Sequence, residues 1–294
     1  MHLSPYEIRV SQEPLQEVSS VGQFGYKYLR ERGGDFYDSR LAAKLGSLAV
    51  GQLAIAPVDI SRLIAEEGSQ ATLLRVPELE KTRHESRTAV QFGQLVVEGA
   101  RRESQAELVA VKYTRPSLAG RELSATREVQ KRLGPASAYE PIGFIGREEK
   151  KDVGYISRYR HEVGTLDRVF WNREATEEQR LAAAGRAGVW LGMLHDSGLV
   201  HGDAEAKNIA HDNADNPVYP DLETMSEIPA DIDEAYRRQV GDLSDFIRFH
   251  DCRLSREEFE AFFETYIDTF SNCLVGVVAI RELYNLPLMT VHHY

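Results

Sequence analysis

The run 201–208, His-Gly-Asp-Ala-Glu-Ala-Lys-Asn, places Asp203 and Asn208 five positions apart, and Asp221-Leu-Glu223 begins thirteen residues later. Phosphoryl transfer from ATP uses a carboxylate that orients the acceptor hydroxyl, and oxygen ligands that hold Mg²⁺ on the phosphates. Asp203 has the residue type for the first task. Asn208 and Asp221 have the type for the second, and Glu223 is either a further metal ligand, a residue that orients one, or a member of a structural salt bridge. The pattern predicts an ATP- and Mg²⁺-dependent phosphotransferase site.

A cation for the donor phosphates is predicted at Lys112. This residue ends the apolar run Glu107-Leu-Val-Ala-Val-Lys112, which is typical of a buried strand. An apolar strand rarely tolerates a lysine without a partner, because burying an unpaired charge is costly. We therefore expect Lys112 to contact phosphate oxygens and to have an acidic partner.

The candidate residues occur along the chain in the same order as the catalytic motifs of a known family. Lys112, a helical segment at 125–133 that carries Glu128, the 201–208 motif and the Asp221 motif together resemble the protein kinase-like superfamily from about residue 70 onwards. The resemblance implies an α+β, two-lobed protein kinase-like fold with an antiparallel-sheet N-lobe and a mainly helical C-lobe. It also implies that Glu128 pairs with Lys112 at the ATP site, with Glu122 on the same segment as the alternative.

Several departures favour an atypical branch of this superfamily. Glu205 stands where protein kinases have a lysine or arginine, and the metal motif reads Asp-Leu-Glu. Only about twenty residues separate Asp221 from Asp242, which leaves little room for a peptide-binding segment. The chain is thus more similar to aminoglycoside, choline and lipopolysaccharide kinases, which implies a hydroxyl acceptor on a small molecule or glycan. Asp242 resembles the family's helix aspartate that holds the catalytic loop, with an N-cap after Gly241 as the competing interpretation.

Three other functions stay open. An atypical protein Ser/Thr kinase would use the same residues on a protein acceptor. A pseudokinase would bind nucleotide or a partner without catalysis, and it is favoured by segment 77–87, which contains no glycine where a phosphate-covering loop is expected. Lys81, Arg83, His84 or Arg87 would replace the loop's backbone donors, or form a solvated charged loop. The third alternative is an enzyme that keeps the ATP site but transfers AMP to its acceptor in place of the γ-phosphate.

Sequence patterns predict the organisation of the chain. We expect an N-terminal extension at 1–65, a kinase-like N-lobe at 66–160 and a C-lobe at 161–294. The predicted strands are 71–76, 90–99, 107–113, 139–146 and 153–159, and the predicted helices are 38–48, 125–133, 176–198 and 255–270. The last two helices each begin with a capping-box sequence, Thr176-Glu-Glu-Gln179 and Ser255-Arg-Glu-Glu258.

Composition excludes several classes. The 294 residues and a hydrophobic content of 42% predict a folded protein with a sizeable core, and the longest apolar stretches are too short to cross a bilayer. A net charge of −11 argues against nucleic acid as a partner. The start of the sequence has no signal-peptide pattern, and two cysteines predict neither a disulfide framework nor a zinc site. We expect a cytoplasmic enzyme.

Overall fold

The chain divides into two compact units. The computed structural model describes Phe36 and residues Tyr6–Arg9, 38–47, Leu53–Ile55, Gln70–Arg75, Val90–Gly99, 102–146, 152–160, 162–247 and 254–270. One unit comprises Met1–Glu128 with Tyr139–His161, and the other comprises Val129–Ala138 with Glu162–Tyr294. The glycine-free segment 77–87, with its four candidate phosphate contacts, lies outside the described residues.

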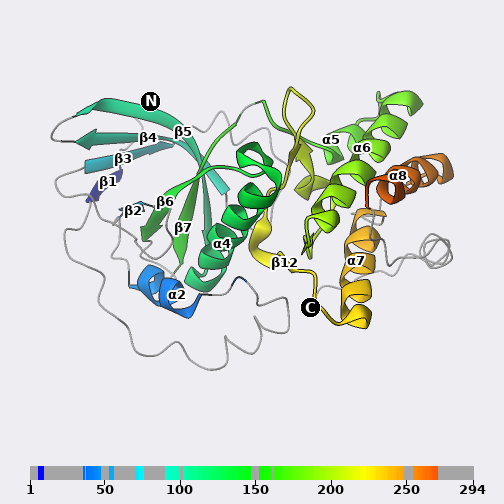
Figure 1. Cartoon of the computed structure of the whole chain (residues 1–294). Helices are drawn as coiled ribbons and strands as arrows, with labels where there is room; N and C mark the ends of the chain where they lie inside the picture. Colours follow the sequence, from blue (N-terminus) through cyan, green and yellow to red (C-terminus); the bar gives the residue numbers. More distant parts are fainter. Residues whose placement is uncertain are drawn as a thin grey trace. The chain divides into compact units, whose positions relative to one another are not determined.

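The first unit contains a seven-stranded sheet with the order β1-β3-β4-β5-β7-β6-β2, in which all neighbouring strands are antiparallel. The strands are β1 (Tyr6–Arg9), β2 (Leu53–Ile55), β3 (Gln70–Arg75), β4 (Val90–Gly99), β5 (Arg102–Thr114), β6 (Pro141–Gly146) and β7 (Val153–Arg158). Both edge strands, β1 and β2, come from the first 65 residues. This N-terminal segment therefore extends the sheet on both sides (Figure 1).

Alternation along β5 determines which side chains reach the helices. Val109 and Val111 are fully buried and pack in one apolar cluster with Leu95 of β4 and Ile156 of β7. Successive side chains of a strand point to opposite faces, so Lys112 lies on the other face. That face carries Tyr155 of β7, which is opposite Lys112 in the register.

Two helices of the first unit cover the face of the sheet that carries Tyr155, where they form a second apolar cluster. The helix α2 (Ser39–Gly46) contributes Leu41 and Leu45, and α4 (Pro116–Leu133) contributes Ala119 and Leu123 to the same cluster as Tyr155. The predicted helix at 125–133 is therefore the second half of a longer helix. It ends before Gly134, as predicted.

The second unit is mainly helical. Its helices are α5 (Asp167–Trp171), α6 (Glu177–Asp196), α7 (Ile232–Ile247) and α8 (Arg256–Thr269), with small antiparallel strand pairs between them (Figure 1). Both predicted capping boxes are confirmed: Thr176 caps α6 and Ser255 caps α8, each with the reciprocal bond. Arg180 of α6 binds Glu258 of α8 through two bonds, at 2.5 and 3.2 Å, which ties the starts of the two helices together.

The predicted fold class is confirmed. An antiparallel sheet forms the N-terminal region and helices dominate the C-terminal region, a mixed architecture consistent with a two-lobed kinase-like fold. The N-cap interpretation of Asp242 is wrong, because this residue lies well inside α7, ten residues after Ile232. Among the described residues, no helix combines the length and apolar character that crossing a membrane requires.

Close packing of α6 on α8 depends on glycine. A Cβ at Gly188 would lie 2.0 Å from the Phe262 carbonyl oxygen and 2.2 Å from Thr265 Oγ1. At Gly185, one turn earlier, the nearest atom would be a methyl carbon of Thr265 at an ordinary 3.7 Å.

We expect Gly188→Ala to lower the free energy of unfolding by about 3 kcal/mol, because backbone must move to admit the methyl group. Gly185→Ala should be neutral or stabilising by up to about 1 kcal/mol, because alanine has the better helix propensity. Urea unfolding of both variants tests this, and equal effects would contradict the packing described.

Candidate active site

The 201–208 motif forms a loop in the second unit. It follows strand β9 (Leu199–Val200), ends in the short 3-10 turn η3 (Ala206–Asn208) and leads into β10 (Ala210–His211). Strand β10 pairs with β8 (Gly164–Thr165) on one side and with β11 (Pro217–Val218) on the other. The loop is therefore anchored at both ends by strands, and we call it the 201–208 loop.

Asp203 and Asn208, five positions apart in the sequence, meet at the ends of this loop. The Asn208 Nδ2 donates to the carboxylate Oδ2 of Asp203 and to its backbone carbonyl oxygen, both at 2.9 Å. Asn208 is 4% exposed, and Asp203 is half-buried. With the amide nitrogen used in this way, the oxygen of Asn208 is the atom left to bind a cation.

Asp242 of α7 holds the backbone at the start of the loop. Its Oδ2 accepts from the His201 N–H at 2.6 Å, and its Oδ1 accepts from the Gly202 N–H at 2.7 Å. Asp242 is 1% exposed, and its buried carboxylate fixes the start of the loop through these two charge-assisted bonds. This is the contact that the family resemblance implies for Asp242.

The segment that follows β11 holds the loop from another side. The His201 Nε2 donates to the Pro220 carbonyl oxygen at 3.1 Å, and Thr224 Oγ1 donates to the His201 carbonyl oxygen at 3.0 Å. Gly202 has a φ of 78°, and a Cβ there would lie 2.6 Å from the Thr224 carbonyl oxygen. Only glycine fits this position without displacing the loop.

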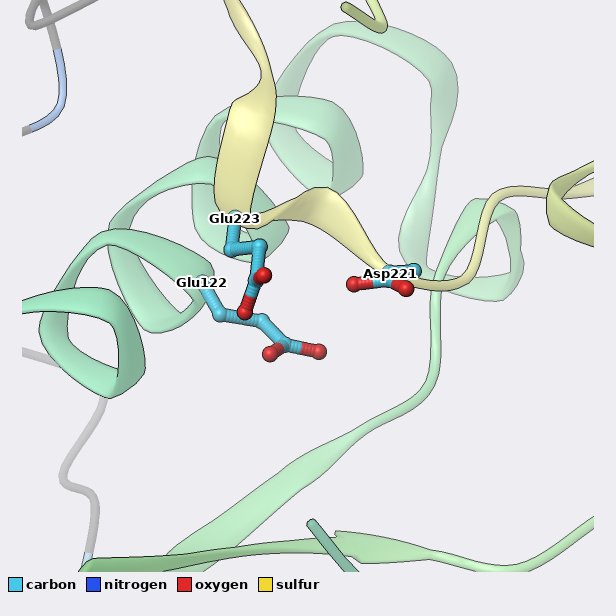
Figure 2. A group of neighbouring side chains, drawn as sticks. All are labelled: Glu122, Asp221 and Glu223. Carbon is cyan, nitrogen blue, oxygen red and sulfur yellow. The ribbon is translucent and has the colours of Figure 1, made fainter. Parts of the chain in front are cut away.

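Asp221 and Glu223 lie on this segment, at the start of the 3-10 turn η4 (Leu222–Thr224) (Figure 2). A carboxylate oxygen of one lies within 4.8 Å of a carboxylate oxygen of the other. Asp221 has a left-handed backbone, with φ 57° and ψ 54°, which aspartate tolerates better than most residues. Both carboxylates are half-buried, so the segment offers two adjacent oxygen ligands of the hard type.

Lys112 in the first unit has an acidic partner on α4. The Lys112 Nζ lies 3.0 Å from Oε2 of Glu122 (labelled in Figure 2), and both residues are buried. This is the alternative partner that the sequence offers. Glu128 is half-buried on the same helix, and six residues correspond to about 9 Å along the axis and about 240° around it, so it occupies a different place on α4. Its ATP-binding role stays a prediction.

Burial and neighbouring charge shift two carboxyl groups near the loop. Burial, followed by the charge of Glu205, raises the pKa of Asp203, and Asp221 adds to the shift. Burial, followed by the charges of Asp242, Asp203 and Glu205, raises the pKa of Asp245 to about 8. A carboxyl group such as Asp245, with a pKa of about 8 in place of about 4, is typical of functional sites.

Three residues near this site were missed by the sequence analysis. Asp245 follows Asp242 by three residues, and this helical spacing was the only available signal. His195 and Tyr266 had none: His195 lies in the last turn of α6, and Tyr266 is one of several aromatic residues of the helix predicted at 255–270. The structure links both to Asp242.

We expect Asp245 to limit activity at alkaline pH. As the pH rises through about 8, this carboxyl gains a charge beside Asp203 and Glu205, which would repel the phosphates of the ATP that the sequence predicts here. Turnover should therefore fall above pH 8 in the wild type, but not in Asp245→Asn.

The free energy of unfolding should also fall as the pH rises, through the same carboxyl group. The folded state favours protonated Asp245, so this stabilisation is complete below the unfolded pKa near 4 and is lost as the pH rises through about 8. The melting temperature of Asp245→Asn should exceed that of the wild type at pH 9 by more than at pH 5. Parallel pH profiles for the two proteins would contradict this.

Comparison with known proteins gives likenesses in structure but none in sequence. No protein-family model matches the chain, and no curated protein matches it in sequence. One solved structure that matches is described as a divergent kinase lacking the glycine-rich loop, which regulates membrane ultrastructure of the Toxoplasma parasitophorous vacuole. The two chains are 16% identical, and the match covers 64% of this chain and 71% of that one with a TM-score of 0.36.

Proposed function

We propose that this protein is an ATP- and Mg²⁺-dependent phosphotransferase that moves the γ-phosphate to a hydroxyl of a small-molecule or glycan-like acceptor. The observation that carries the proposal is the pairing of Asp203 with Asn208 in a loop held by Asp242, beside two adjacent carboxylates of the same unit. A proton acceptor and oxygen ligands are the groups that this chemistry needs.

Asp203 would orient the acceptor hydroxyl and take its proton as the phosphate is transferred. Its raised pKa supports this role, because a carboxylate with a higher pKa is a stronger base once it is deprotonated. The bond from Asn208 restricts the rotation of the carboxylate. The acceptor would therefore meet a base in a fixed orientation, which is the main protein contribution to phosphoryl transfer.

Asn208, Asp221 and Glu223 fit Mg²⁺ by their donor chemistry. Two oxygens bound to one Mg²⁺ at about 2.1 Å each lie about 3 to 4 Å apart. The separation of Asp221 and Glu223, at most 4.8 Å, reaches this range through small rotations of either side chain. Mg²⁺ held there would neutralise charge on the ATP phosphates.

Lys112 would contact the donor phosphates, and Glu122 would hold its side chain in place. A buried lysine is stable only with a partner, and the 3.0 Å bond to Glu122 supplies one. Arrival of ATP would give the ammonium group a second set of anionic partners. The proposed acceptor class is supported by the departures Glu205 and Asp-Leu-Glu, which resemble the small-molecule branch.

The test uses ATP labelled either in the γ- or in the α-phosphate, with separate pools of sugars, amino alcohols and proteins. Transfer of γ-label to the sugar or amino-alcohol pool, lost when EDTA removes Mg²⁺, is the expected result. Transfer to the protein pool alone would replace the acceptor class, and transfer of α-label would indicate AMP transfer. Metal-dependent ATP binding without transfer to any pool would contradict the proposal in favour of a pseudokinase.

A further inference from the structure

A continuous chain of buried side chains connects α8 to the 201–208 loop. The Tyr266 hydroxyl of α8 lies 2.7 Å from Nδ1 of His195 on α6, and the His195 Nε2 lies 3.0 Å from Oδ2 of Asp242 on α7. The same Oδ2 accepts from the His201 N–H. All four residues are at most 1% exposed, so water does not compete for these bonds.

Hydrogen-bond chemistry sets the direction of each proton in this chain. A carboxylate only accepts, so the His195 Nε2 must donate to Asp242. In a neutral imidazole the other nitrogen then accepts, and the Tyr266 hydroxyl must be its donor. The Asp242 carboxylate therefore requires the Nε2–H tautomer, and the Tyr266 hydroxyl stabilises this tautomer by donating to Nδ1.

The geometry of the rings supports a role for this hydroxyl in orientation. The His195 and Tyr266 rings meet edge to face at 89° with centroids 5.6 Å apart, and Phe270 packs on His195 at 5.9 Å. Aromatic packing limits the tilt of the imidazole, but it does not choose between the ring's two flipped orientations. The bonds to Tyr266 and Asp242 make that choice.

We propose that Tyr266 is a positioning residue for catalysis. Its hydroxyl fixes the tautomer and the orientation of His195, so that Asp242 presents both carboxylate oxygens to the backbone of the 201–208 loop and keeps Asp203 in its working orientation. The catalytic part of this inference rests on the proposed phosphotransfer. The part concerning the His195 tautomer does not.

The test compares Tyr266→Phe with Thr265→Val, which removes a neighbouring α8 hydroxyl that bonds to the Gly185 carbonyl oxygen. We expect Tyr266→Phe to lower kcat about three- to tenfold, the range for one buried hydrogen bond, with the KM for ATP within twofold of wild type. Thr265→Val should keep the wild-type kcat. Equal kcat for the two variants would overturn the proposal.

A double-mutant cycle tests the route. In His195→Gln, the side-chain amide still donates to Asp242, but the acceptor for the Tyr266 hydroxyl is gone. Adding Tyr266→Phe to this variant should cause no further loss of kcat, whereas independent and additive losses would overturn the route through His195.

Imidazole NMR of the wild type and Tyr266→Phe gives a readout without catalysis. Protonation at Nε2 in the wild type, altered in the variant, is expected, and an unchanged spectrum would overturn the proposal. A wild type that shows this tautomer but no phosphotransfer would instead contradict the proposed function alone.

Discussion

Asp203→Asn is expected to lower ATP-dependent transfer by about 10²- to 10⁴-fold, the range for loss of a general base. An amide has the shape of the carboxylate but does not accept a proton from the acceptor hydroxyl. Its oxygen still accepts from the Asn208 Nδ2, so the loop should keep its conformation. Single-turnover transfer of γ-label measures the chemical step without product release.

The same substitution should preserve or raise stability. Burial and Glu205 raise the pKa of Asp203, so the fold favours the protonated form. The stability that this gives is complete below the unfolded pKa near 4 and is lost as the pH rises through the raised folded pKa. Above the raised folded pKa the charge destabilises the fold, and removing it should maintain or raise the melting temperature.

Asp233→Asn is the matched control, because it removes an exposed carboxylate from the first turn of α7. It should leave transfer unchanged. If Asp203→Asn lowers the melting temperature along with transfer, Asp203 would be a structural residue rather than a base. Active sites typically contain charged groups that lower the stability of the fold, and this is the behaviour expected of Asp203.

Local sequence signals predicted the framework of the fold well. The capping boxes at Thr176 and Ser255 and the stop at Gly134 specified helix ends, because each rests on residues within one turn. Apolar and β-branched runs predicted five strands of the sheet, which correspond to β3, β4, β5, β6 and β7. Its two edges were not predicted, because β1 and β2 are four and three residues long and pair with strands far away in the sequence.

Contacts between distant elements limited the prediction of the site. The spacing of Asp203 and Asn208 is local, and the two residues do bond to each other. The choice of Glu122 over Glu128 as the residue bonded to Lys112 depends on which side of α4 faces β5, and both glutamates fit the sequence pattern equally well. The link from Tyr266 to Asp242 joins three helices, and no spacing within any one of them reveals it.

Asp221→Ala and Asp221→Asn are both expected to lose Mg²⁺-dependent transfer by about 10²-fold or more, because each removes the charge of a proposed metal ligand. They should differ in stability. Asp221 has a φ of 57°, a left-handed conformation that costs alanine about 1 kcal/mol and that asparagine tolerates. Urea unfolding should therefore show a loss of about 1 kcal/mol for the alanine variant alone.

Asp215→Ala separates backbone strain from metal binding. Asp215 has a similar φ of 63° but lies in the turn between β10 and β11 and is not one of the proposed metal ligands. Its alanine variant should lose a similar free energy of unfolding and keep full transfer at every Mg²⁺ concentration. Asp221→Asn could instead keep wild-type transfer and the wild-type Mg²⁺ dependence. That result would show that Asp221 serves the geometry of the turn and that other residues bind the metal.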